Sequence, residues 1–161
     1  MGYPIHASMC CMRKIASLSA FLIVAGFALP GTAQEAAKPS LTGTWQLDAA
    51  KSELHNSKMT GATWVIDEGD NSIHITATES GKGKKIEMQC TTDGKECQVT
   101  GDKSRASFWY NGPILVEMQT RGDTVTRFKM KASEDGKTLT VELTHIVPQI
   151  DKSDLMVFQK Q

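Results

Sequence analysis

Three histidines are the most versatile chemical groups in the part of the chain that follows its N-terminal apolar segment. His55, His74 and His145 stand far apart and lack the short spacing of metal ligands. The sequence also lacks a Gly-x-Ser-x-Gly elbow, a phosphate loop, a dinucleotide fingerprint, a His-Glu-x-x-His helix and a Cys-x-x-Cys pair. We therefore predict no metal, no cofactor and no catalytic residue, and the sequence favours a protein that is not an enzyme without excluding one.

His145 is the histidine with a specific alternative. It shares the parity of Leu139, Val141 and Leu143 in an alternating run, near the end of that run. Some small β-barrels that hold haem place an axial ligand in such a position. The sequence favours a hydrogen-bonded or rim histidine, and a haem binder or small-barrel enzyme is the third alternative.

An acid and a base fall in adjacent alternating runs. Glu117 and Arg127 could pair across two neighbouring strands. We expect a surface contact worth under about 1 kcal/mol. The alternative, an acid and a base that line an interior cavity, is the arrangement that catalysis would need.

Cys90 and Cys97 form an even pair around a turn signal. Asp93-Gly94 lies midway between them, and this dipeptide suits a tight hairpin turn whose two central residues need positive φ. In that register the two cysteines lie opposite each other, so we predict a structural disulfide worth roughly 2–3 kcal/mol.

Alternating hydrophobicity defines the elements that must position all of these residues. From Leu41 onward apolar residues recur at every second position, and turn residues rich in Gly, Asp and Asn separate the runs. Consecutive hairpins make an up-and-down meander, and closing it removes exposed edges. We predict an all-β fold, an antiparallel β-barrel of about 8–10 strands. The predicted strands are Gly43–Asp48, Ala62–Glu68, Ser72–Thr78, Lys84–Cys90, Glu96–Thr100, Ser104–Tyr110, Ile114–Thr120, Thr124–Lys131, Thr138–His145 and Asp154–Lys160.

The first residues are typical of a targeting segment. From Met12 the chain has two basic residues, then the apolar stretch Ile15–Leu29, then small residues up to Ala33. Fifteen apolar residues are too few to span a hydrocarbon core about 30 Å thick, so we expect cleavage after Ala33 and no stable membrane insertion. Met12 is a candidate for the true start. The predicted parts are a signal peptide (1–33), a flexible lead-in (34–40) and a barrel domain (41–161).

Charge and composition restrict the partners. The chain has 18 bases and 18 acids, and the predicted leader holds two of the bases and none of the acids. The mature part is therefore slightly acidic, and its only tight basic run, Lys82 to Lys85, is short and interrupted by glycine. We predict no nucleic-acid binding, because that needs a clustered basic surface.

One motif resembles a known family. Leu41-Thr42-Gly43-Thr44-Trp45-Gln46-Leu47 resembles the Gly-x-Trp signature that opens the first strand of lipocalins, in which the Trp plugs the closed barrel end and the Gly lets the chain bend. Ala50-Lys51-Ser52, Asp93-Gly94-Lys95, Val99-Thr100-Gly101 and Asp135-Gly136-Lys137 are similar to segments of small exported bacterial lipocalin-like proteins of largely unassigned function. Lipocalins usually place an Arg over that Trp, whereas the last strand here offers Lys152 and Lys160.

The resemblance covers Leu41 to Gln161 and implies a barrel that binds a small apolar molecule. We therefore predict an exported protein, periplasmic or extracellular in a bacterium, that binds a small hydrophobic or amphipathic molecule. The alternative is a non-catalytic envelope protein with a filled barrel that acts through surface contacts. The oligomeric state is left open. Strand parity selects the expected ligand walls, which are Trp64, Phe108, Tyr110, Met118 and Phe128.

Overall fold

A computed structural model describes residues 38–57, 60–81 and 83–161, and the predicted signal peptide lies outside these residues. Over the described ranges the chain forms ten β-strands and no helix. No helix there is long and apolar enough to cross a bilayer. The strands are β1 (Gly43–Leu47), β2 (Ala62–Glu68), β3 (Ser72–Glu79), β4 (Lys85–Thr91), β5 (Asp93–Thr100), β6 (Arg105–Asn111), β7 (Ile114–Arg121), β8 (Thr124–Ala132), β9 (Thr138–Val147) and β10 (Asp154–Lys160).

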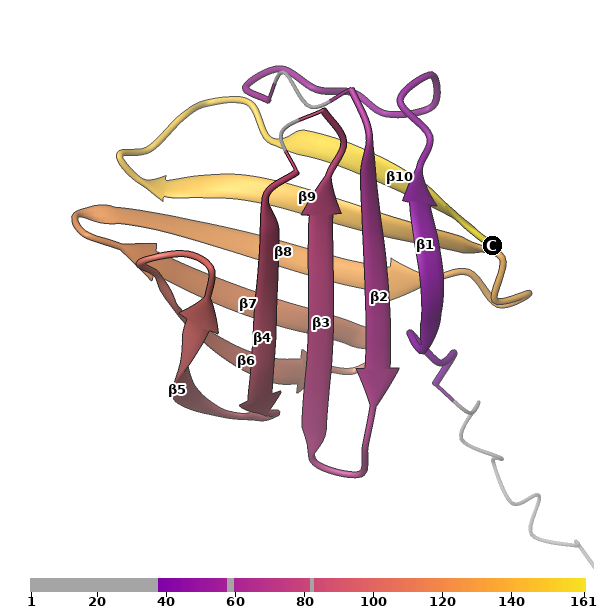
Figure 1. The fold of residues 1–161 in the computed structure, drawn as a ribbon, viewed down its shortest axis with the longest axis horizontal. Coiled ribbons are helices and arrows are strands. Elements are labelled where there is room, and N and C mark those ends of the chain that lie inside the picture. The colour runs from indigo at the N-terminus through magenta and orange to yellow at the C-terminus, as the bar shows by residue number, and fades with distance from the viewer. Residues whose placement is uncertain (1–37, 58–59, 82) are drawn as a thin grey trace, which may run out of the picture. The chain divides into compact units, whose positions relative to one another are not determined.

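The strands form a closed antiparallel barrel, which confirms the predicted fold class. Each strand pairs with the next along the chain, and β10 returns to pair with β1 through Trp45 and Lys160. Strands β2 to β4 run almost vertically in Figure 1, while β7 to β9 cross behind them. The barrel is therefore a continuous meander without a free sheet edge.

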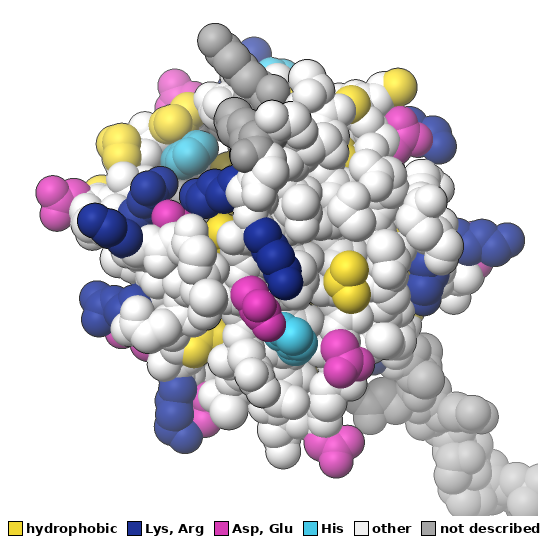
Figure 2. All heavy atoms as spheres, in the orientation of Figure 1, with side chains coloured by type: hydrophobic (Ala, Val, Ile, Leu, Met, Phe, Trp, Pro, Cys, Tyr) yellow, Lys and Arg dark blue, Asp and Glu magenta, His cyan; other side chains and the backbone are white. Residues whose placement is uncertain are grey.

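Alternation along the strands gives the barrel its interior. In β3 the buried residues Ile73, Ile75 and Ala77 alternate with more exposed polar ones. The outer surface is mixed: Figure 2 shows basic, acidic and histidine side chains interspersed over the face of the molecule in that view, with scattered hydrophobic ones. The large side chains with almost no exposure form the core and include Trp45, Phe108, Phe158, Ile66, Ile73, Leu115, Met130 and Leu139.

A disulfide joins β4 to β5, as predicted. Cys90 and Cys97 are bonded, with their Cα atoms 5.6 Å apart. The turn itself differs from the expected one, because Asp93 and Gly94 belong to β5 and the ladder to β6 is irregular between Asp93 and Glu96. The bulge leaves the two cysteines facing each other while the strand begins earlier than the pattern predicted.

Trp45 is buried in the barrel core and pairs with Lys160, the last residue of β10. Its side chain has no exposure, and its Nε1 donates a hydrogen bond to the Leu41 carbonyl at 2.8 Å. Lys160 Nζ lies 5.2 Å from the centre of the Trp45 ring, so a lysine takes the place over the tryptophan that the resemblance assigns to an arginine. Gly43 has a φ of +149° and its Cα faces the Lys160 stem, where a Cβ would collide with Cε. Glycine is therefore required for Lys160 to lie across the tryptophan.

The end of the barrel where β1 begins carries a partly buried hydrogen-bond cluster that ties the N-terminal lead-in to the barrel. Glu68, at the end of β2, accepts hydrogen bonds from the Tyr110 hydroxyl, the Leu41 backbone N–H, Ser40 Oγ at 2.9 Å and Lys38 Nζ at 3.1 Å. Lys38 Nζ also lies 3.4 Å from the centre of the Tyr110 ring. Burial alone would raise the pKa of Glu68, but these donors outweigh it and lower the pKa below its usual value.

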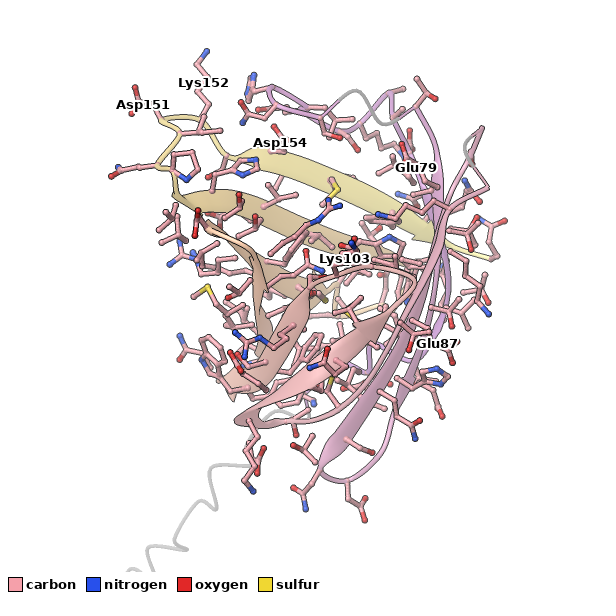
Figure 3. The ribbon with its side chains drawn as sticks, turned by 60° about the vertical axis from the view of Figure 1, so that its left-hand side comes forward. Glu79, Glu87, Lys103, Asp151, Lys152 and Asp154 are labelled. Atoms are coloured by element: carbon pink, nitrogen blue, oxygen red, sulfur yellow. A yellow bond between two sulfur atoms is a disulfide. The ribbon has the colours of Figure 1, made fainter. Side chains whose placement is uncertain are left out.

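At the opposite end, the connection from β1 to β2 is held by β10. The segment Ala49–Leu54 forms a tight turn and then pairs Glu53 with Leu155. Buried Asp154 accepts hydrogen bonds from the backbone N–H groups of His55 at 2.7 Å and Asn56 at 2.8 Å. Figure 3 shows Asp154 at the end of the barrel where Glu79 also lies.

Candidate functional site: an acid-bearing cavity in the barrel

The barrel contains a partly open cavity of about 190 Å³. It reaches the end where β3 turns into β4, marked by Glu79 in Figure 3, and Trp45 is not among its lining residues. Its wall is mostly apolar and comes from strands β2, β3, β4, β7, β8, β9 and β10. The lining residues are Ala62, Trp64, Ala77, Thr78, Glu79, Lys84, Ile86, Met88, Glu117, Gln119, Phe128, Leu143 and Met156.

Glu117 is the one carboxyl that is fully buried in this wall. It lies on β7, is 2% exposed, and its cross-strand partners are Phe108 on β6 and Phe128 on β8. Among the described residues, no hydrogen bond or ion pair reaches its carboxyl group. Burial away from water therefore raises its pKa to about 8, because the ionised form loses its hydration and gains nothing in return. At neutral pH Glu117 holds a proton and can donate it in a hydrogen bond.

Arg127 does not pair with Glu117, contrary to the expectation of a surface ion pair. The register places Arg127 opposite Met118 and Thr144, so it belongs to the outer face of β8. Glu117 belongs to the inner face, and the sheet separates the two side chains. Arg127 Nε is buried on its own side and lacks a hydrogen-bond partner among the described residues.

The expected ligand walls are only partly brought together. Trp64 and Phe128 line the cavity. Phe108 is fully buried in the core, and the Tyr110 hydroxyl donates a hydrogen bond to Glu68 at the end of the barrel where β1 begins. Met118 was expected to face inward, and that orientation is wrong, because its partners in the ladders are Ser107 and Arg127 on the outer face.

The sequence favoured a surface position for Glu117 over the interior alternative because the β7 run does not alternate. Leu115, Val116 and Glu117 are consecutive and all buried, so hydrophobicity alone assigns no inner face. The tight turns on both sides of β7 fix the register of the strand and therefore the face on which Glu117 lies. They set Glu117 opposite Phe108 and Phe128, and cross-strand partners point to the same side of a sheet.

The histidines lie outside this cavity wall. His145 is opposite Thr126 near the end of β9 and is not among the lining residues. His74 Nε2 lies 2.8 Å from Glu87 Oε1, and both side chains are substantially exposed. Across the described ranges, no group of three or more His, Cys, Asp or Glu side chains could hold a metal ion.

Several solved structures have the same fold. Fatty-acid-binding protein 1 of Echinococcus granulosus is 14% identical, with a TM-score of 0.58 over 74% of this chain and 96% of its own. A Schistosoma mansoni fatty-acid-binding protein in complex with arachidonic acid is 14% identical, with a TM-score of 0.57 over 74% of this chain and 95% of its own.

A third structure, the REP1-NXSQ fatty acid transporter, is 16% identical, with a TM-score of 0.60 over 75% of this chain and 96% of its own. No protein-family model and no curated protein sequence matches the chain. At such low identity the likeness shows a shared architecture, the barrel of fatty-acid-binding and lipocalin-like proteins.

Proposed function

We propose that the protein binds a small hydrophobic or amphipathic molecule inside its barrel. The observation that carries this proposal is the cavity of about 190 Å³ with a mostly apolar wall. A filled barrel, the alternative from the sequence, would have no reason to leave such a space, because protein interiors are close-packed. The names of the three similar structures, all tied to fatty acids, agree with a ligand of this class.

The cavity volume limits the size of the ligand. A buried apolar cavity of about 150 Å³ is known to hold benzene, so 190 Å³ suits a molecule of roughly eight non-hydrogen atoms. A long chain such as arachidonic acid would need the cavity to enlarge. Ligands of this size reach dissociation constants of roughly 0.1–1 mM.

Titration with benzyl alcohol, followed by amide chemical shifts, tests the proposal. We expect saturable binding with shifts at Ala77 and Leu143, which line the cavity. Ala77→Leu fills part of the space and should weaken binding tenfold or more. Val65→Leu, on the exposed outer face of neighbouring β2, is the matched control and should leave binding unchanged. Shifts that do not saturate, or that are unaffected by Ala77→Leu, would contradict the proposal.

We also propose that the chain belongs with exported bacterial lipocalin-like proteins and loses residues 1–33 on export. The three-part leader pattern in the sequence supports this, and so does the Cys90–Cys97 disulfide, since disulfides persist in oxidising compartments. Intact-mass measurement of protein recovered from the periplasm should give a polypeptide that begins at Gln34. A mass that retains the leader would count against export with cleavage.

A further inference from the structure

We propose that the ligand carries an amine, and that this amine pairs with Glu117 inside the barrel. The inference rests on the proposed function, because it assigns chemistry to the same cavity. It stands on the position of one carboxyl in an apolar wall that offers it no partner.

The surroundings of Glu117 explain why a ligand group is needed. Phe108 and Phe128 flank it across the two ladders, and neither can donate a hydrogen bond. An unpartnered buried carboxyl costs folding free energy, whereas a phenylalanine or leucine at this site would not. The carboxyl is thus a polar group without a partner among the described residues, and it lines a cavity in which a ligand could bring one.

The charge of the cavity favours a cation over an anion. The other two ionisable residues of its wall, Glu79 and Lys84, are at its end. Lys84 Nζ is 3.5 Å from Asp102 Oδ1, so its charge is already partly balanced by an acid. The remaining wall is uncharged on every strand that contributes to it: Ala62, Trp64, Ala77, Thr78, Ile86, Met88, Gln119, Phe128, Leu143 and Met156. Two inward residues near the same end, Asp154 and His145, do not line the space.

A carboxylate ligand would lack a cation at the depth of Glu117. Arg127, the nearest base along the β7–β8 ladder, lies on the outer face. An ammonium group, by contrast, would meet the carboxyl and also the aromatic side chains of Trp64 and Phe128, and aromatic rings attract cations. The wall therefore selects an amine with a small apolar body.

Proton balance gives this proposal a specific signature. Free Glu117 holds a proton at pH 7, and a free alkylammonium group also holds its extra proton. The complex keeps one of these two protons, whether as carboxylate with ammonium or as carboxylic acid with amine. Binding therefore releases one proton. As the pH is raised toward 8, the affinity for the amine should increase about tenfold per pH unit.

The experiment is calorimetric titration of the full-length mature protein with benzylamine, benzyl alcohol and benzoate, which share a ring and differ in charge. Runs at pH 7 in phosphate and in MOPS, which are not primary amines and whose ionisation enthalpies differ, count the protons released. We expect close to one proton released per benzylamine bound, about 0.9 for a pKa near 8, and none with benzyl alcohol.

Variants separate the roles of the acid and the cavity. Glu117→Gln should weaken the affinity for benzylamine tenfold or more and abolish proton release, while the affinity for benzyl alcohol should change less than threefold. Glu142→Gln removes an acid that pairs with Lys129 on the outer face of β9, and it should change the affinity for neither ligand. The wild-type proton count stands even if Glu117→Gln folds poorly.

The outcomes distinguish the two proposals. Benzyl alcohol binding with no preference for benzylamine, or benzylamine binding without proton release, would overturn the amine assignment and leave the apolar binding function intact. Tighter binding of benzoate than benzylamine would do the same. Failure of all three probes to bind would overturn the binding function itself, and the amine assignment with it.

Discussion

Replacing Glu117 by Gln should make the barrel more stable at high pH. Gln has nearly the same shape and no charge, so the substitution removes the ionisation of a group that sits between Phe108 and Phe128. The folded pKa of Glu117 is about 8, raised by burial from the usual 4.5. Between these two values the folded state holds a proton that the unfolded state has lost, so the stability of the wild type falls as pH rises through this window.

The magnitude follows from the same two pKa values. A tenfold change in an acid's dissociation constant is worth about 1.4 kcal/mol, so the full effect is on the order of 5 kcal/mol between pH 4.5 and pH 8. Water entry into the cavity reduces it, and we expect at least about 2 kcal/mol to remain. Below pH 4.5 both residues are neutral and the two proteins should agree within about 1 kcal/mol.

Urea unfolding of wild type, Glu117→Gln and Glu142→Gln at pH 4.5, 7 and 9 measures this effect. The contributions of all other titrating groups cancel in each difference from wild type. Glu117→Gln should gain stability over wild type steadily with pH, whereas Glu142→Gln, which removes a 40% exposed carboxylate, should not show this gain. A difference for Glu117→Gln that does not change from pH 4.5 to pH 9 would refute the buried, unpaired state of this acid.

Three further predictions concern the fold around the cavity. Tyr110→Phe removes a hydrogen-bond donor to Glu68 and should lower the free energy of unfolding by about 1–2 kcal/mol at pH 7, measured by urea unfolding. This loss should shrink below pH 4.5, because the depressed pKa of Glu68 contributes stability only while the carboxyl group is ionised. An unchanged unfolding midpoint at pH 7 would contradict the hydrogen bond. Replacing Cys90 and Cys97 together by Ser should lower the free energy of unfolding by roughly 2–3 kcal/mol, measured against the oxidised wild type, and equal stability would show that the crosslink is not formed in solution. Gly43→Ala should lower the melting temperature by several degrees, since it places a Cβ at positive φ against a lysine stem of the last strand, and no change would mean that this stem lies elsewhere.

The sequence predicted the strands well because each one carries its own signal. Alternation and turn residues located all ten strands within a few residues, and the largest disagreements are the earlier start of β5 at Asp93 and the later end of β9 at Val147. The bulge after Asp93 explains the first. Gly94, expected at the tip of a two-residue turn, instead has positive φ within the strand. A local pattern can thus indicate where the chain bends without specifying whether a residue such as Gly94 lies in the turn or in the adjoining strand.

The hydrogen-bond cluster at Glu68 and the cavity depend on contacts that no local pattern encodes. Tyr110 is 42 residues from Glu68, and Lys38 is 30 residues from it, so their cluster exists only once the barrel has closed. The cavity volume likewise depends on how side chains from seven strands fill one interior. Small residues such as Ala62 and Ala77 leave space in the interior. The sequence around them does not show whether a larger side chain from another strand fills that space.

The position of Glu117 could have been worked out from register rather than from hydrophobicity. The β6–β7 turn pairs Asn111 with Ile114, and counting back along the strands sets Phe108 opposite Glu117. The β7–β8 turn pairs Arg121 with Thr124, and the same count sets Glu117 opposite Phe128. Both phenylalanines were expected to face inward, and partners across an antiparallel ladder share a face, so an inward Glu117 was already implied. In a closed meander each short turn fixes which residues of its two strands face inward. Burying a charged residue without a partner destabilises the fold. An ionisable residue that two independent turns place inward is therefore a candidate functional group.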